Sequence, residues 1–116
     1  MKNERFSHVQ NLEHLLRCPE EVGIKKKVIS CAKEIIWKRD KVNVYTEIDL
    51  WFYTERDEYG IAHNVVEFKS SLREVNRGKA LNQLAKAEEW VKFLFDEKSH
   101  KYIVWKNGNR YDTEKI

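Results

Sequence analysis

Apolar residues recur at helical spacing in three parts of the chain. In residues 3–17 they lie at Phe6, Val9, Leu12, Leu15 and Leu16, and this spacing predicts a short amphipathic helix. Pro19 ends the pattern and suits the first position of a new helix, and the two glutamates that follow it suit a first turn. A second helix is therefore predicted over residues 19–38, and apolar spacing predicts a third over residues 79–95.

Segments rich in β-branched and aromatic residues predict the strands. Residues 42–53 and 63–71 have this composition, and the polar segment 54–60 between them ends in a glycine that indicates a turn. A further strand is predicted at residues 102–105, before an Asn-Gly-Asn turn at residues 107–109. The order is α-α-β-β-α-β, which predicts an α/β fold in which helices flank a small mixed β-sheet.

The composition is that of one globular domain. The chain has 116 residues, of which 41% are hydrophobic and 35% are charged, and this length supports one core but not two. Residues 1–116 are therefore expected to form a single domain, with residues 1–18 as an N-terminal helical extension. The net charge of +3 permits a nucleic-acid partner without requiring one.

The cysteines and the N-terminus favour a cytoplasmic, intracellular protein. Cys18 and Cys31 have no metal-ligand spacing, and the first ten residues contain no apolar run of the kind that a signal peptide needs. No segment approaches the roughly 18 consecutive apolar residues of a membrane span, so no membrane partner is expected. The scattered histidines are interpreted as structural or surface residues: His8, His14, His63 and His100.

The two central strands bring acidic residues together if they pair as a hairpin. A loop centred near Glu58 places Asp49 opposite Glu67, and the alternation of strand side chains puts Lys69 on the same face as Glu67. Opposed carboxylates repel each other unless positive charge lies between them, and Mg²⁺ meets that need. The opposite face is expected to pack against a helix through Ile48, Leu50, Phe52, Val66 and Phe68. The alternative is that Glu67 and Lys69 form an ordinary solvent-exposed ion pair.

The stretch EIDLWFY…VVEFKSS resembles the PD-(D/E)xK nuclease superfamily, in which an Asp on one strand and a following E-x-K strand form the metal site. The resemblance covers roughly residues 19–105 and implies a restriction-endonuclease-like core. It also implies a DNA endonuclease that hydrolyses phosphodiester bonds with Mg²⁺ or Mn²⁺ by in-line attack of water. In that role Asp49 and Glu67 hold the metal and Lys69 activates the water. The small size and the run of three lysines also resemble Holliday-junction resolvases and small viral or plasmid nucleases.

The third predicted helix carries a further part of the resemblance. Gln83, in the sequence LNQLAKA, matches the glutamine of RecB-type members, and it would orient Lys69 or a phosphate. Ala87 stands where those members have a tyrosine.

Members of the superfamily usually add a glutamate from the first core helix, and the chain offers Glu21 or Glu34. At about 100° per residue, Glu21 falls within the apolar stripe of the predicted helix 19–38, whereas Glu34 falls outside it. Glu21 is therefore expected to face the sheet and to complete the metal site. The alternative is that Glu21 only complements the positive end of that helix.

Basic and polar residues beside such a site are expected to contact DNA phosphates, which position DNA without reading its sequence. These candidates are Lys25, Lys26, Lys27, Ser70, Arg73 and Arg77. An ordinary solvated surface is the alternative for the basic ones. A two-fold homodimer is expected because one small site reaches one strand, with Phe6, Val9, Leu16 and Trp37 as candidate contacts. The rival functions are a catalytically silent relative that binds DNA and an interaction module.

Overall fold

A computed structural model describes residues 4–39 and 44–116 of the chain, which form a compact α/β domain. Its elements are α1 (Glu4–Arg17), the short 3₁₀ helix η1 (Pro19–Val22), β1 (Val28–Arg39), β2 (Val44–Thr54), β3 (His63–Lys69), α2 (Glu74–Phe95), β4 (Ser99–Asn107) and β5 (Arg110–Lys115). The strands form one mixed sheet in the order β1-β2-β3-β4-β5. Neighbouring strands are antiparallel except β3 and β4, which are parallel and are connected by α2.

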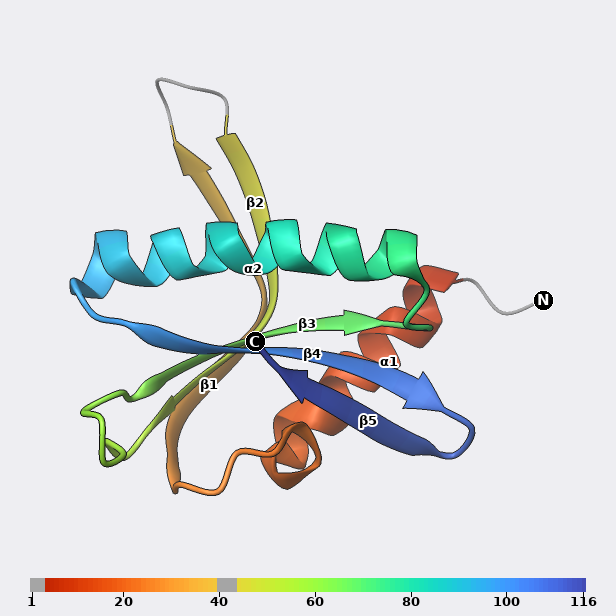
Figure 1. Ribbon diagram of the computed structural model, residues 1–116, viewed down its shortest axis with the longest axis horizontal. Coiled ribbons are helices and arrows are strands. Elements are labelled where there is room, and N and C mark those ends of the chain that lie inside the picture. The colour runs from red at the N-terminus through yellow and green to blue at the C-terminus, as the bar shows by residue number, and fades with distance from the viewer. Residues whose placement is uncertain (1–3, 40–43) are drawn as a thin grey trace.

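The two helices lie on opposite faces of the sheet (Figure 1). α1 packs Leu12 and Leu15 against one face, in a cluster that includes Leu50 and Phe52 of β2. α2 covers the other face with Ala80, Leu84, Ala87, Trp90 and Val91, which pack against Val65 of β3 and Ile103 of β4. Leu12 and Leu15 are completely buried, so α1 is part of the core of the domain. In the part of the chain that the structure describes, neither helix has the length and apolar content needed to cross a membrane.

The predicted second helix is wrong, because residues 28–39 form strand β1. β1 pairs with β2 along nearly its whole length, from Val28 opposite Thr54 to Arg39 opposite Val44. The apolar residues of this segment have a helical spacing, but several of them are β-branched. The long pairing with β2 outweighs the local pattern. Only residues 19–22 keep a helical turn, the 3₁₀ helix η1.

The other predicted elements are confirmed, with shifted ends. α1, β2, β3 and β4 lie where the pattern places them, and α2 begins at Glu74, five residues before the predicted start. The turn at residues 107–109 joins β4 to an unpredicted strand, β5. Gly108 has a φ of 65° there, a conformation that glycine adopts easily. Because β5 is a polar edge strand, its sequence carries no apolar signal.

The alternation of side chains along β2 changes at Asp49. Leu50 and Phe52 pack against a helix as predicted, and that helix is α1, whereas Ile48 belongs to the cluster under α2. The prediction that these three residues share one face is therefore wrong for Ile48. Across from Asp49, Glu34 of β1 has a φ of 51°, which is uncommon for a residue other than glycine.

Candidate functional site

Strands β2 and β3 bring the two predicted acids together. Leu50 pairs with Val66 and Trp51 with Val65, and the same register places Asp49 beside Glu67. This agrees with the register expected from the sequence.

The two carboxylates are buried, with exposed fractions of 5% for Asp49 and 4% for Glu67. Burial raises the pKa of Glu67 well above its usual range, and the neighbouring Asp49 raises it further. The positive charge of Lys69 lowers the pKa of Glu67, since Lys69 Nζ lies 3.9 Å from Glu67 Oε2. The site therefore favours the addition of positive charge near Glu67.

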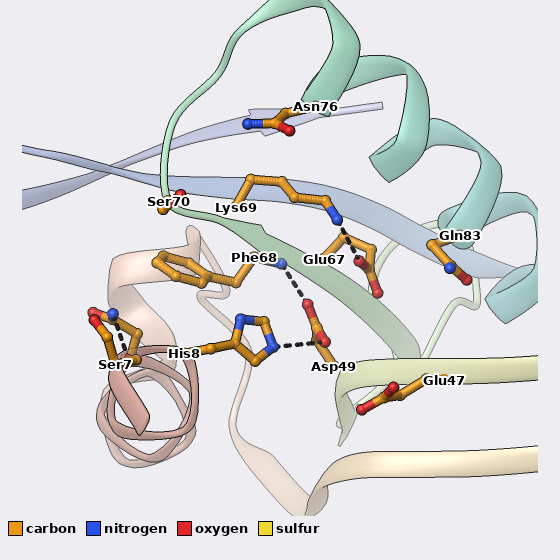
Figure 2. Close-up of a pocket in the computed structure, with 11 residues that line it drawn as sticks. Ser7, His8, Glu47, Asp49, Glu67, Phe68, Lys69, Ser70, Asn76 and Gln83 are labelled. Carbon is orange, nitrogen blue, oxygen red and sulfur yellow. Dashed lines mark hydrogen bonds and ion pairs between the residues drawn. The ribbon is translucent and has the colours of Figure 1, made fainter. Parts of the chain in front are cut away.

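Asp49 is held by two hydrogen bonds from different elements. The backbone N–H of Phe68 on β3 donates to Asp49 Oδ2 at 2.9 Å. His8 Nε2, on α1, lies 3.2 Å from Asp49 Oδ1. These contacts fix the orientation of the carboxylate (Figure 2).

His8 was expected to be structural or surface, and the structure places it at the site. Its hydrogen bond with Asp49 is the main cause of a raised pKa of His8, with a smaller contribution from the charges of Asp49 and Glu34. Its partner lies 41 positions away in the chain, so no local spacing in the sequence marks it.

A cleft of about 560 Å³ surrounds these groups, and residues of α1, β2, the end of β3 and the first half of α2 line it. Figure 2 shows the side chains that line it. They are Ser7, His8, Asn11, Glu47, Asp49, Glu67, Phe68, Lys69, Ser70, Asn76 and Gln83. The sequence did not predict that the residues of α1, Glu47 and Asn76 line this cleft. Glu47 precedes Asp49 by two strand positions, and this spacing is the signal that could have identified it.

Gln83 lies on α2 beside the cleft, as the resemblance implied. Its Oε1 is buried and has no hydrogen-bond partner among the described residues. A buried amide oxygen normally has a partner, so this atom is available to a ligand in the cleft.

Glu21 does not line the cleft, and its predicted place in the metal site is wrong. It belongs to η1, and its carboxylate contacts His14 Nε2. The prediction failed because it assumed a helix where the chain forms β1. Glu34 lies on β1 opposite Asp49, and its charge contributes to the raised pKa of His8, so it is nearer to the site than Glu21. Its carboxylate, however, forms an ion pair with Lys33 at 3.6 Å.

The predicted DNA contacts separate into two groups. Ser70 lines the cleft, and Arg73 is exposed at the start of α2. Arg77 is paired instead with Glu114 of β5, with Nη2 and Oε1 at 2.6 Å.

The run of three lysines does not adjoin the cleft. Lys25, Lys26 and Lys27 are exposed in the loop before β1, and the backbone oxygen of Lys27 accepts a hydrogen bond from the N–H of Glu55. Since Asp49 and Glu55 are six residues apart along the chain, these lysines lie roughly 15–20 Å from the carboxylates.

The residues predicted for a dimer surface are only partly available. Trp37 is 9% exposed, and its ring lies 5.7 Å from that of Phe93, so it does not form an open surface. Val9 and Leu16 are partly buried on a helix that belongs to the core. The side chain of Phe6 lies outside those that the structure describes.

The donors in the cleft fit a hard divalent cation. Asp49 and Glu67 supply carboxylate oxygens and Gln83 an amide oxygen that lacks a partner, and Mg²⁺ and Mn²⁺ prefer such ligands. The chain matches no family model and no curated protein.

Proposed function

We propose that this protein is a Mg²⁺-dependent nuclease that hydrolyses phosphodiester bonds in DNA at the cleft that contains Asp49, Glu67 and Lys69. The observation that carries this proposal is the pair of buried carboxylates, Asp49 and Glu67, on adjacent strands. Burial, and after it the charge of Asp49, raises the pKa of Glu67, and the positive charge of Lys69, 3.9 Å away, lowers it. A divalent cation would remove the repulsion between the two carboxylates.

The residues of the cleft have distinct roles in this proposal. A bound cation would supply Lewis-acid polarisation of the phosphate. Asp49 and Glu67 would hold it, with Gln83 Oε1 or Glu47 as a further oxygen donor. Lys69 carries a positive charge into the same cleft, where it would stabilise the negative charge that develops on the phosphate.

The arrangement of the elements also supports the resemblance to PD-(D/E)xK nucleases. The aspartate is on β2, the E-x-K motif ends β3, and the glutamine is on the following helix α2. A restriction-endonuclease-like fold is accordingly part of the proposal.

A catalytically silent relative that binds DNA is the second candidate. One observation in its favour is that Glu21 does not line the cleft. Another is that Asp49 already accepts hydrogen bonds from His8 and from the Phe68 N–H. The enzyme reading is preferred because Lys69 and both carboxylates line one open cleft.

Cleavage of supercoiled plasmid DNA with Mg²⁺, and with EDTA as the control, tests the proposal. We expect metal-dependent nicking that is lost in Asp49→Ala and Lys69→Ala, by at least about a hundredfold for each electrostatic group removed. DNA binding without cleavage would support the silent relative. Cleavage by Asp49→Ala at the wild-type rate would rule out this site.

A further inference from the structure

Three side chains of different chemistry meet where α1 ends: His14 in its last turn, Cys18 just after it and Glu21 on η1. A ring nitrogen of His14, Cys18 Sγ and a carboxylate oxygen of Glu21 all lie within 4.8 Å of one another. We propose that these three groups bind a transition-metal ion of the Zn²⁺ class. The proposal is independent of the nuclease function.

Local backbone structure holds the three donors in place. The N–H of Cys18 donates to the backbone oxygen of His14 at 3.0 Å, which puts Cys18 one turn after His14. The N–H of Glu21 donates to the backbone oxygen of Cys18, also at 3.0 Å. Leu15 and Val22, which are completely buried, anchor the two turns in the core. The site therefore needs little rearrangement to form, and a preformed site binds at a lower entropic cost.

The His14 ring is oriented by a strand at the other end of the chain. It stacks on Tyr111 of β5, with the ring centres 5.4 Å apart and the planes at 15°. The Tyr111 hydroxyl in turn donates to Asn11 Oδ1 at 2.5 Å. This packing fixes the ring while Nε2 faces Glu21.

The chemistry of the donors selects the class of metal. Imidazole nitrogen, thiolate sulfur and carboxylate oxygen are the ligands of Zn²⁺, whereas Mg²⁺ takes oxygen ligands. Binding would release the thiol proton of Cys18 to solvent. Three protein ligands leave a fourth tetrahedral position for water.

The surroundings also favour a cation. The carbonyl end of α1 carries partial negative charge, and Glu21 lies beside it. The side chains of His14 and Glu21 are 42% and 37% exposed, so an ion can reach them from solvent. In the metal-free chain these two side chains contact each other directly, and a metal ion would replace that contact.

Occupancy of this site would stabilise the helix that forms one wall of the cleft. The ion would join the end of α1 to η1, and the stacked Tyr111 would extend the connection to β5. Because a ligand that binds only the folded chain stabilises it by mass action, Zn²⁺ should raise the melting temperature.

Co²⁺, which has visible absorption where Zn²⁺ has none, is the probe that tests the site. We expect one Co²⁺ per chain with a thiolate-to-metal charge-transfer band, removed by Zn²⁺ but not by excess Mg²⁺. Cys18→Ser should abolish the band. Cys31→Ser, at the exposed second cysteine, should keep it, and Asp49→Ala should keep it because that residue belongs to the other site. A band that survives Cys18→Ser, or the absence of any band in the wild-type chain, overturns the proposal.

Alkylation of the unaltered chain gives a second test that does not depend on the folding of a variant. Zn²⁺ should slow the alkylation of Cys18 at least about tenfold, because the metal-bound sulfur is a poorer nucleophile. Cys31 provides the internal control and should react at the same rate with and without Zn²⁺. Equal rates for Cys18 in both conditions would contradict the proposal.

Discussion

Asp49 on β2 and Glu67 on β3 lie beside each other, and each is at most 5% exposed. We expect this pair to make the protein less stable, in the absence of a cation, than a variant with an uncharged side chain in place of one acid, because a buried carboxylate is costly beside another one. The acids would therefore be retained at the expense of stability, as is common for functional sites.

Replacement of Glu67 by Gln should raise the melting temperature of the metal-free protein by several degrees. The substitution removes a charge that burial and Asp49 both disfavour, and about 1 kcal/mol corresponds to about 4–8 °C in a small domain. Mg²⁺ should stabilise the wild type more than the variant. Thermal unfolding followed by circular dichroism, with EDTA and with Mg²⁺, measures both effects. A variant that melts below the wild type in EDTA would contradict the account of the site.

Glu47→Gln should lower the cleavage rate, because Glu47 contributes a carboxylate to the cleft. The matched control is Glu55→Gln, at an exposed position just after the other end of β2, which should cleave at the wild-type rate. Single-turnover cleavage at saturating Mg²⁺ gives the comparison. Equal rates for Glu47→Gln and the control would limit the metal site to Asp49, Glu67 and Gln83.

The sequence predicted that Asp49 and Glu67 lie together, but it did not predict the other residues around them, and the reason is physical. Asp49 and Glu67 belong to one hairpin, so turn position and strand alternation determine their register. His8 reaches Asp49 only because α1 packs on the sheet, which is a tertiary contact. Glu21 was assigned from helical phase, and that assignment failed when the pairing of β1 with β2 outweighed the local pattern.

The salt dependence of DNA binding should distinguish the two groups of basic residues. Arg73→Ala should weaken binding and reduce the slope of log K against log salt by about 0.9, which corresponds to one lost phosphate contact. Lys26→Ala should change neither, because Lys26 lies in the loop before β1, away from the cleft. Fluorescence anisotropy at several salt concentrations measures both slopes. If Lys26→Ala weakens binding and Arg73→Ala does not, DNA binds at the loop before β1 instead.

Asp57 in the loop between β2 and β3 should make stability fall at low pH. The side chain of His100 and the N–H groups of Ile61 and Tyr59 lower the pKa of Asp57 from 3.8 to about 2. The folded state thus favours the ionised form, so this contribution is present above pH 3.8 and is lost as the pH falls through about 2. Urea unfolding across that range should show a shallower decline for Asp57→Asn than for the wild type.

His100→Asn provides the control for this pair, since it removes the main partner of Asp57. It should flatten the same part of the pH profile, and the double variant should differ little from either single one. Additive effects of the two substitutions would show that the pair does not act as a unit.

A two-fold dimer on duplex or branched DNA is the last expectation, because one cleft reaches one strand and two related clefts reach both. Trp37 is buried and is therefore a poor candidate for the dimer contact. Phe93 and Leu94, near the end of α2, are better candidates, because their exposed fractions are 65% and 52%. Sedimentation equilibrium at micromolar concentration, with and without a four-way junction, should show a dimer at least on the junction. Phe93→Asp should weaken it, whereas Val75→Asp, which is 69% exposed at the other end of α2, should not. A monomer in both conditions would remove the dimer and the resolvase-like function, and would leave an enzyme that nicks one strand at a time.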